Sequence, residues 1–330
     1  MTRTIIIAGT LGLTACVHAP EYNAVDPVNK ASVASVTQLP WQDVIVGVPN
    51  LDDVPRLFTE IGGFETLRST DNMLLLSAPG ADSGHIRFKK TALDAVKTRP
   101  FGSHAWDTGC YFSIMMRAKD IPSIVNDAAP LGWEPLTELA YLEFGPSKLN
   151  IIVLGHVETG IQVQLYERLT TPLPEGFTPF NRISRPFNIM QMVADSDKAV
   201  GFYRDVLGFE TFYHGPPTVS QKPEVVPIGI PKELSMTTSY RAGIVTPKTG
   251  LEWGRMEMIA VDKTGGNDLS PQCQGGNIGI TEVRFKVDNI NAVKKTLTSR
   301  MTPMQMEAHH ISVKTPDGAN ITFYENKGVE

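Results

Sequence analysis

Two short stretches of the chain alternate acidic and basic side chains in a pattern that could carry out proton transfer. Arg255 and Glu257 alternate in "RMEMIAV", and Glu282 and Arg284 alternate in "TEVRFKV". A carboxylate can remove a proton next to a carbonyl, and a nearby guanidinium can stabilise the oxyanion that forms. Tyr324, in "NITFYE", is a phenol that could return the proton. These residues are therefore candidates for a catalytic site.

The apolar residues between these charges predict β-strands and assign the side chains to faces. Successive side chains of a strand point to opposite faces, and the apolar set is expected to face the covering helices. In "TEVRFKV" the apolar set is Val283, Phe285 and Val287. The polar residues named above, Arg255, Glu257, Glu282, Arg284 and Tyr324, are therefore expected on the opposite face, where Asn188 and Thr322 join them on the same argument.

A repeat organises these strands. The sequence "GFET" occurs at residues 63–66 and 208–211, and each copy follows an alternating strand pattern and a helical pattern. The glycine stands where each helix must end. The strand–helix pattern recurs at residues 110–133 and 280–301, and each of those copies continues into further strands. The chain is therefore predicted to hold four βαβββ modules.

The motif "VADSDKAVGFYRDVLGFE" followed by "TPDGANITFYE" resembles the vicinal oxygen chelate superfamily, which includes glyoxalases, bleomycin-resistance proteins and dioxygenases. The resemblance implies an α+β fold in which the four modules form two curled-sheet cups that hold a small-molecule ligand. It implies a glyoxalase-like domain at residues 39–168, a linker at 169–184 and a second such domain at 185–330. In this arrangement each half of the chain forms one cup.

Metal-using members of that superfamily take one ligand from the first strand and one from the last strand of each module. Those positions hold Asn188, Glu257, Glu282 and Thr322 in the second half, and Asp43, His85, Ser113 and Gln164 in the first half. The resemblance thus implies a divalent metal held by Asn188, Glu257 and Glu282. Alternatively, the two glutamates pair with Arg255 and Arg284, which would offset the cost of burying their charges.

Several functions remain open on this basis. The first is an isomerase or lyase in which Glu257 or Glu282 is the base, Arg255 or Arg284 holds the oxyanion, and Tyr324 or His310 returns the proton. The second is a non-catalytic protein of the bleomycin-resistance type that sequesters a small molecule, and the third is an interaction scaffold. An extradiol-type dioxygenase is disfavoured, because the ligand positions of neither half hold the two histidines that iron would need beside a carboxylate.

The N-terminus predicts a membrane anchor. Arg3 precedes an apolar run from Ile5 to Leu13, which is shorter than the ~20 residues that span a bilayer. The run ends in "LTAC", which resembles a bacterial lipobox with Cys16 as the lipidated residue. The resemblance implies a signal peptide at residues 1–15, a flexible tether at 16–38, and a lipid anchor at the periplasmic face of the cell envelope. In the lipoproteins that this motif resembles, an Asp directly after the lipidated Cys retains the protein at the inner membrane. This chain has Val17 at that position, which favours the outer membrane.

The composition limits the partners. The net charge of -5 comes from mixed acids and bases without a long run of one sign, so neither nucleic acid nor a membrane surface is an expected partner. Membrane contact is expected through the lipid alone, and the chain is expected to be a monomer with two pseudo-symmetric domains or a dimer.

The segment 212–250, rich in Pro and Gly, is expected to be a lid or a surface loop. Cys110 and Cys273 are expected to be small buried or loop residues, although an oxidising compartment allows a disulfide.

Overall fold

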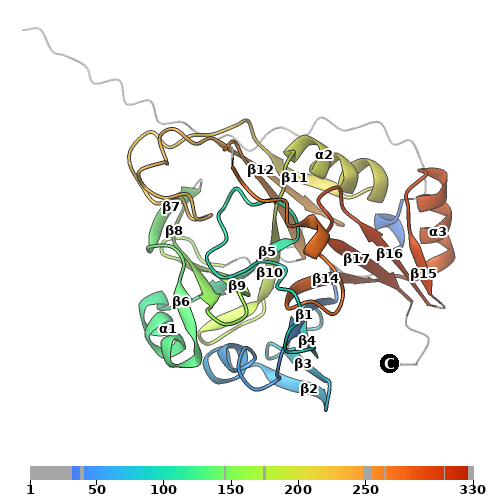
Figure 1. The fold of residues 1–330 in the computed structure, drawn as a ribbon, viewed down its shortest axis with the longest axis horizontal. Coiled ribbons are helices and arrows are strands. Elements are labelled where there is room, and N and C mark those ends of the chain that lie inside the picture. Colours follow the sequence, from blue (N-terminus) through green and yellow to red (C-terminus); the bar gives the residue numbers. More distant parts are fainter. Residues whose placement is uncertain are drawn as a thin grey trace, which may run out of the picture.

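The four predicted modules are present in the computed structural model, which describes residues 32–37, 41–144, 146–173, 176–248, 254–263, 265–307 and 309–325 (Figure 1). Cys16, the predicted signal peptide and most of the predicted tether lie outside the described residues. Module 1 contains β1 (Asp43–Val48), the short helix η2 (Leu57–Ile61), β2 (Glu65–Thr70), β3 (Met73–Ser77) and β4 (His85–Lys90). Module 2 contains β5 (Tyr111–Ala118), α1 (Ile121–Ala128), β6 (Trp133–Pro135), β7 (Ala140–Phe144), β8 (Ser147–His156) and β9 (Gln162–Arg168).

The second half of the chain repeats this order. Module 3 contains β10 (Ile183–Met192), α2 (Ser196–Gly201) continuing as η4 (Phe202–Leu207), β11 (Glu210–His214), β12 (Tyr240–Thr246) and β13 (Arg255–Val261). Module 4 contains β14 (Gly279–Lys286), α3 (Ile290–Ser299), β15 (Gln305–Glu307), β16 (His310–Lys314) and β17 (Asn320–Tyr324). The described residues also form single-turn helices: η1 (Ala34–Val36) precedes β1, η3 (Ala129–Leu131) follows α1, and η5 (Ser270–Gln272) lies between β13 and β14.

The two "GFET" glycines end helices, as the repeat predicts. Gly63 and Gly208 have φ values of 70° and 77°. This left-handed conformation costs a residue with a Cβ about 1–2 kcal/mol, and glycine adopts it freely. Each glycine therefore turns the chain from its helix into the next strand, β2 or β11.

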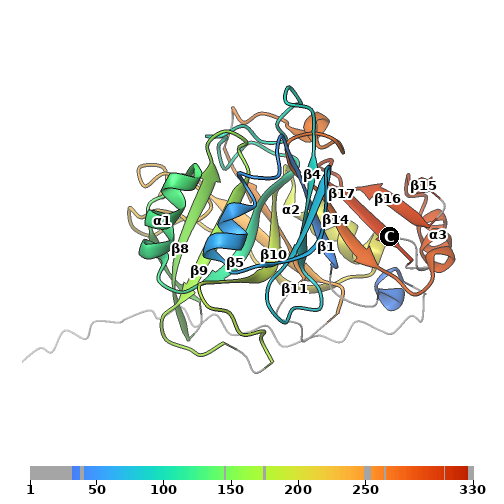
Figure 2. The ribbon, with the colours of Figure 1, turned by 90° about the horizontal axis from the view of Figure 1, so that it is seen from below.

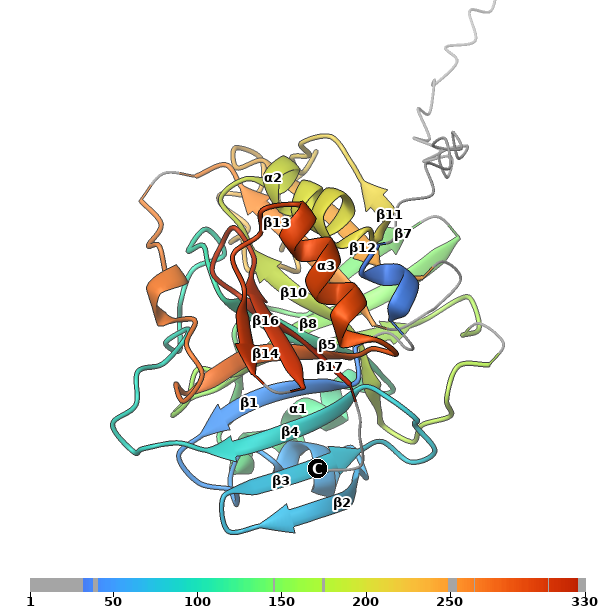
Figure 3. The same ribbon diagram turned by 90° about the vertical axis from the view of Figure 1, so that its right-hand side faces the viewer.

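The prediction that each half of the chain forms one cup is wrong. One sheet has the order β15-β16-β17-β14-β1-β4-β3-β2 and so joins module 4 to module 1, and the other has the order β11-β12-β13-β10-β5-β9-β8-β6 and joins module 3 to module 2. Figure 3 shows the red strands of module 4 continuing into the blue strands of module 1. We call the two concave faces the 1/4 cup and the 2/3 cup.

First strands hold each pair of modules together. β1 pairs antiparallel with β14, and Asp43 lies opposite Arg284. β10 pairs antiparallel with β5, and Met190 lies opposite Ser113. Figure 2 shows β5 beside β10, and β1 beside β14. The alternation of apolar and polar residues is similar in the strands of every module, so it does not predict which modules share a sheet.

The alternation itself is confirmed. Val283, Phe285 and Val287 are buried in the main hydrophobic core, which extends through both sheets. Met190 and Met192, on the opposite face of β10 from that core, belong to a separate apolar cluster. The faces were therefore assigned correctly, although the partner of each module was not.

A disulfide links the two sheets. Cys110 and Cys273 are bonded, with a Cα–Cα distance of 5.1 Å. Cys110 directly precedes β5 in module 2, and Cys273 follows η5 on the approach to module 4. Both are buried, as predicted, but the expectation that they are unbonded is wrong.

In the described part of the chain no helix is both long enough and apolar enough to cross a membrane.

Candidate functional site

The sheet pairing divides the predicted site residues between two cups. Asn188 on β10 and Glu257 on β13 belong to the 2/3 cup. The 1/4 cup receives Glu282, Arg284, Tyr324 and His310. A metal held jointly by Asn188, Glu257 and Glu282 is therefore contradicted. Tyr324 and His310 likewise cannot return a proton to a substrate bound at Glu257.

Glu257 is a partly buried carboxyl in the 2/3 cup. Asn188 lies beside it because β10 and β13 are parallel neighbours, with Met190 opposite Glu257. The side-chain N–H of Asn188 donates to Oε2 of Glu257 at 2.7 Å. Burial raises the pKa of Glu257 to about 7, although the Asn188 hydrogen bond and the charge of Arg255 act in the opposite direction. The Glu257 side chain nevertheless keeps partial solvent access, so it is not sealed in the core.

Two phenols accompany this carboxyl. Burial raises the pKa of Tyr166 well above its ordinary value, and the charge of Glu257 adds to that effect. Burial also raises the pKa of Tyr240, with smaller contributions from Tyr213, Glu224 and Glu257. Both phenols therefore remain protonated hydrogen-bond donors at neutral pH. Tyr166 was not among the site residues predicted from the sequence.

The 2/3 cup also contains buried polar atoms without hydrogen bonds to the described residues. These atoms are Oδ1 of Asn188 and both amide atoms of Gln162. The two side chains are only 2% and 1% exposed. Native proteins rarely leave buried polar groups unpaired, and such groups commonly bind a ligand or an ordered water. Gln162 is thus a candidate site residue that was not predicted from the sequence.

The long segment between β11 and β12 covers the 2/3 cup. Its residues Val226, Ile228 and Ile230 are buried in the same apolar cluster as Met190 and Met192. The side-chain N–H of Gln164 donates to the carbonyl oxygen of Pro227 at 2.6 Å. Of the two predicted roles for this segment, the structure therefore supports the lid. It packs against the apolar side chains on the concave face of this sheet.

The 1/4 cup is open and contains a hollow of about 530 Å³. Asp43 lies behind its floor, with 1% of its side chain exposed. Oδ2 of Asp43 accepts from Nε and Nη2 of Arg87 at 3.1 and 2.8 Å. Nη1 of Arg284 lies 3.8 Å from the same oxygen, and Nδ1 of His85 lies 3.4 Å from Oδ1. Burial acts to raise the pKa of Asp43, but the His85 hydrogen bond and the charges of Arg87 and Arg284 hold it below its usual value.

The other predicted residues of the 1/4 cup form pairs among themselves. Oε1 of Glu282 lies 3.8 Å from Nε of Arg284, which is the ion-pair alternative raised by the sequence. The guanidinium of Arg284 stacks over the Tyr324 ring, 4.3 Å from its centroid. At the rim, Nε2 of His310 lies 2.8 Å from Oε2 of Glu307. No catalytic arrangement comparable to the one around Glu257 is formed by these residues.

The described residues of the two cups do not form a ready divalent-metal site. In the 1/4 cup the predicted ligand positions hold Asp43, His85, Glu282 and Thr322, but both oxygens of Asp43 already contact protein groups, and Arg87 directs its charge at the same carboxylate. The family positions of the 2/3 cup hold Ser113, Gln164, Asn188 and Glu257, which supply a single carboxylate. Divalent cations of this kind prefer several anionic oxygen or imidazole ligands. Among the described residues there is also no cluster of three His, Cys, Asp or Glu side chains placed to hold a metal.

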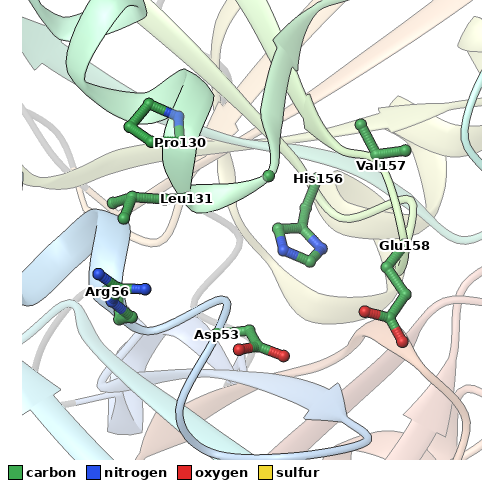
Figure 4. A pocket seen from close by; sticks show the side chains of 8 residues that line it. Asp53, Arg56, Pro130, Leu131, His156, Val157 and Glu158 are labelled. Atoms are coloured by element: carbon green, nitrogen blue, oxygen red, sulfur yellow. The ribbon is translucent and has the colours of Figure 1, made fainter.

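A second hollow, of about 330 Å³, shares no lining residue with the 1/4 cup (Figure 4). His156 lines it, with Asp53 and Glu158 nearby. Nδ1 of His156 lies 3.0 Å from Oγ1 of Thr159, and the ring packs edge-on against Trp133. Burial lowers the pKa of His156, with smaller opposing effects from Asp53 and Glu158. This histidine is therefore a neutral, structurally packed side chain at pH 7.

Comparisons with known proteins identify the fold. No protein-family model matches the sequence, and no curated protein is significantly similar to it. Glyoxalase I from Zea mays is 14% identical, and the alignment covers 86% of this chain and 92% of the maize chain with a TM-score of 0.58. A Bacillus subtilis protein named as a candidate dioxygenase is 10% identical, with 88% of this chain and 86% of its own covered and a TM-score of 0.51. The chain has the vicinal oxygen chelate fold that its motifs predicted, and fold alone does not fix activity.

Proposed function

We propose that this chain is a proton-transfer enzyme, an isomerase or lyase, that acts on a small organic molecule in the 2/3 cup. The observation that carries the proposal is the partly buried carboxyl of Glu257, with a pKa of about 7. A general base works best when its pKa lies near the working pH. The substrate class that fits is a carbon acid with a C–H bond next to a carbonyl.

The residues around Glu257 suit that chemistry. Asn188 holds Oε2 of Glu257, which leaves Oε1 to take the proton from carbon. The enolate oxygen that develops would be stabilised by the charge of Arg255 and by donation from the phenols of Tyr166 and Tyr240. Glu257 then holds the proton and returns it to the neighbouring carbon in an isomerase, or to the leaving group in a lyase. The unpaired amide atoms of Gln162 and Asn188 would bind the polar groups of the substrate.

Glu257→Gln is expected to lower the rate of proton abstraction by about 10²–10⁴-fold, because Gln cannot accept the proton. The measurement is deuterium incorporation from D₂O into a panel of small carbonyl compounds, followed by NMR. The wild-type rate should rise with pH and level off above an inflection near pH 7, where Glu257 becomes ionised. Glu210→Gln, which removes an exposed carboxyl on β11 of the same sheet, is the matched control and should exchange at the wild-type rate. Wild-type exchange by Glu257→Gln would rule out this base.

The same variant has a stability readout that needs no substrate. The pKa of Glu257 is raised in the folded state, so its ionisation opposes folding as the pH rises from about 4.5 through about 7. Glu257→Gln should therefore be more stable than the wild type at pH 8 and similar to it at pH 4. Urea unfolding at both values tests this, and an equal effect at both would contradict the burial of the carboxyl.

We also propose that the protein is a lipid-anchored envelope protein at the periplasmic face. Support comes from the "LTAC" motif and from the Cys110–Cys273 disulfide, which suits an oxidising compartment. Full-length protein expressed in bacteria fed a labelled fatty acid should incorporate the label and sediment with membranes. Cys16→Ala should abolish both properties, and a soluble, unlabelled wild type would contradict the anchor.

A further inference from the structure

The lining of the 1/4 cup distributes its charges unevenly between its two walls. The wall from module 1 presents three cations, Arg68 on β2 with Arg87 and Lys89 on β4, and no acid. The wall from module 4 presents both lining acids, Glu282 and Glu307, and each lies close to a basic group of the same wall, Arg284 or His310. The module 1 wall is therefore the more positive of the two.

The floor of this cup is held in place by buried charges. Asp43 contacts Arg87 and Arg284, whose side chains are only 12% and 8% exposed. A guanidinium fixed in this way loses little conformational freedom when it binds an anion, because its carboxylate neighbour has already oriented it.

Exposed cations and hydroxyl groups complete the lining. Arg68 and Lys89 are exposed, on strands that lie on either side of β3, so removing them should not disturb the fold. The hydroxyls of Ser312 and Thr322 lie 2.7 Å apart on the opposite wall. Arginine and lysine are the usual protein partners of carboxylate and phosphate groups, and the hydroxyls supply further hydrogen-bonding groups across the hollow.

We infer that the 1/4 cup is a binding site for a small organic anion, whose carboxylate or phosphate group lies against Arg68, Arg87 and Lys89. The rest of the ligand lies toward Glu282 and Glu307, which favours hydrogen-bond donors or a positive group at that end. A hollow of about 530 Å³ has room for a molecule of metabolite size. The site lies in a different sheet from Glu257 and does not depend on the proposed proton transfer.

The test is isothermal titration calorimetry on the full-length protein with three probes: inorganic phosphate, succinate, and the zwitterion phosphoserine. Saturable binding is expected for at least one probe, and it should weaken as salt rises. The phosphate and succinate arms separate the two kinds of anion, and phosphoserine tests the acidic wall. Failure of all three probes to bind would overturn the inference.

Variants locate the binding. Arg68→Ala/Lys89→Ala should weaken the affinity by about 10-fold or more, since each cation loses a charge-assisted contact. Lys294→Ala/Lys295→Ala removes two exposed lysines of α3 and is the charge-matched control, with no change expected. Equal affinity in the Arg68/Lys89 variant and the wild type would overturn the assignment. Glu257→Gln should bind the probe as the wild type does, so failure of the enzyme proposal would not affect this result.

Discussion

Asp43→Ala should lower the free energy of unfolding by about 3–5 kcal/mol, the largest effect expected of a single substitution in this chain. The carboxylate is buried at the centre of the 1/4 sheet, where it contacts His85, Arg87 and Arg284. Removing it leaves two largely buried guanidinium groups near each other without their shared counter-ion. Urea unfolding at pH 7 measures the difference.

The pH dependence of that difference follows from the sign of the pKa shift. The pKa of Asp43 is lowered in the folded state, so its stabilising contribution is complete above the ordinary pKa of an aspartate. The contribution is lost as the pH falls through the lowered value. The gap between wild type and Asp43→Ala should therefore be widest near neutrality and narrow in strong acid. Asp52→Ala, an exposed carboxyl in the loop after β1, is the control and should stay within about 0.5 kcal/mol of the wild type. A similarly small effect at Asp43 would show that its charge contacts do not hold the sheet.

Loss of the disulfide should be the second large effect. The bond joins residues separated by 163 positions, and the chain-entropy relation for a loop of that length gives about 5 kcal/mol. The double variant Cys110→Ser/Cys273→Ser should therefore unfold at markedly lower denaturant, and reduction of the wild type should have a similar effect. The bond joins module 2 to the approach of module 4, so its loss removes the covalent tie between the two sheets.

A control variant separates the contribution of the covalent bond to stability from the contribution of apolar packing around the two sulfurs. The two sulfurs lie with Leu269 in a small buried cluster, so serine substitution also removes some apolar contact. Cys110→Ala/Cys273→Ala keeps that environment apolar and should still lose most of the stability that the oxidised wild type has. If reduced and oxidised wild type unfolded at the same urea concentration, the bond would contribute nothing measurable.

The sequence predicts the helix ends and the strand faces well, because nearby residues determine both. The "GFET" glycines end their helices, and the alternation around Val283 and Phe285 orients β14 as expected. The choice of partner for each module has no such local cause. β1 and β10 both present an alternating edge, and only the three-dimensional path of the connections decides that β1 pairs with β14 and β10 with β5.

The candidate site was predicted in part for the same reason. Glu257 and Asn188 were correctly placed on one face, and they are neighbours because β10 and β13 are parallel strands of one module. Glu282 was wrongly added to them because module 4 was assumed to share their cup. Tyr166 and Gln162 come from module 2, which was expected in the other cup, so their approach to Glu257 could not be foreseen. The disulfide was missed because nothing in the spacing of its cysteines reveals which segments the fold brings together.

The pairing of the first module with the last has a consequence for how the protein reaches its native state. β1 needs β14 as its neighbour, and two complete modules are synthesised between them. Contacts between such distant parts of a chain slow folding, because the chain must lose the entropy of closing a long loop before these contacts can stabilise it. The middle modules can assemble while synthesis continues, whereas the N-terminal strands must wait with an unpaired edge until almost the whole chain is available. Folding of the sheet that contains β1 and β14 is therefore expected to be the slow step. It is also the step most exposed to aggregation or to capture by a chaperone.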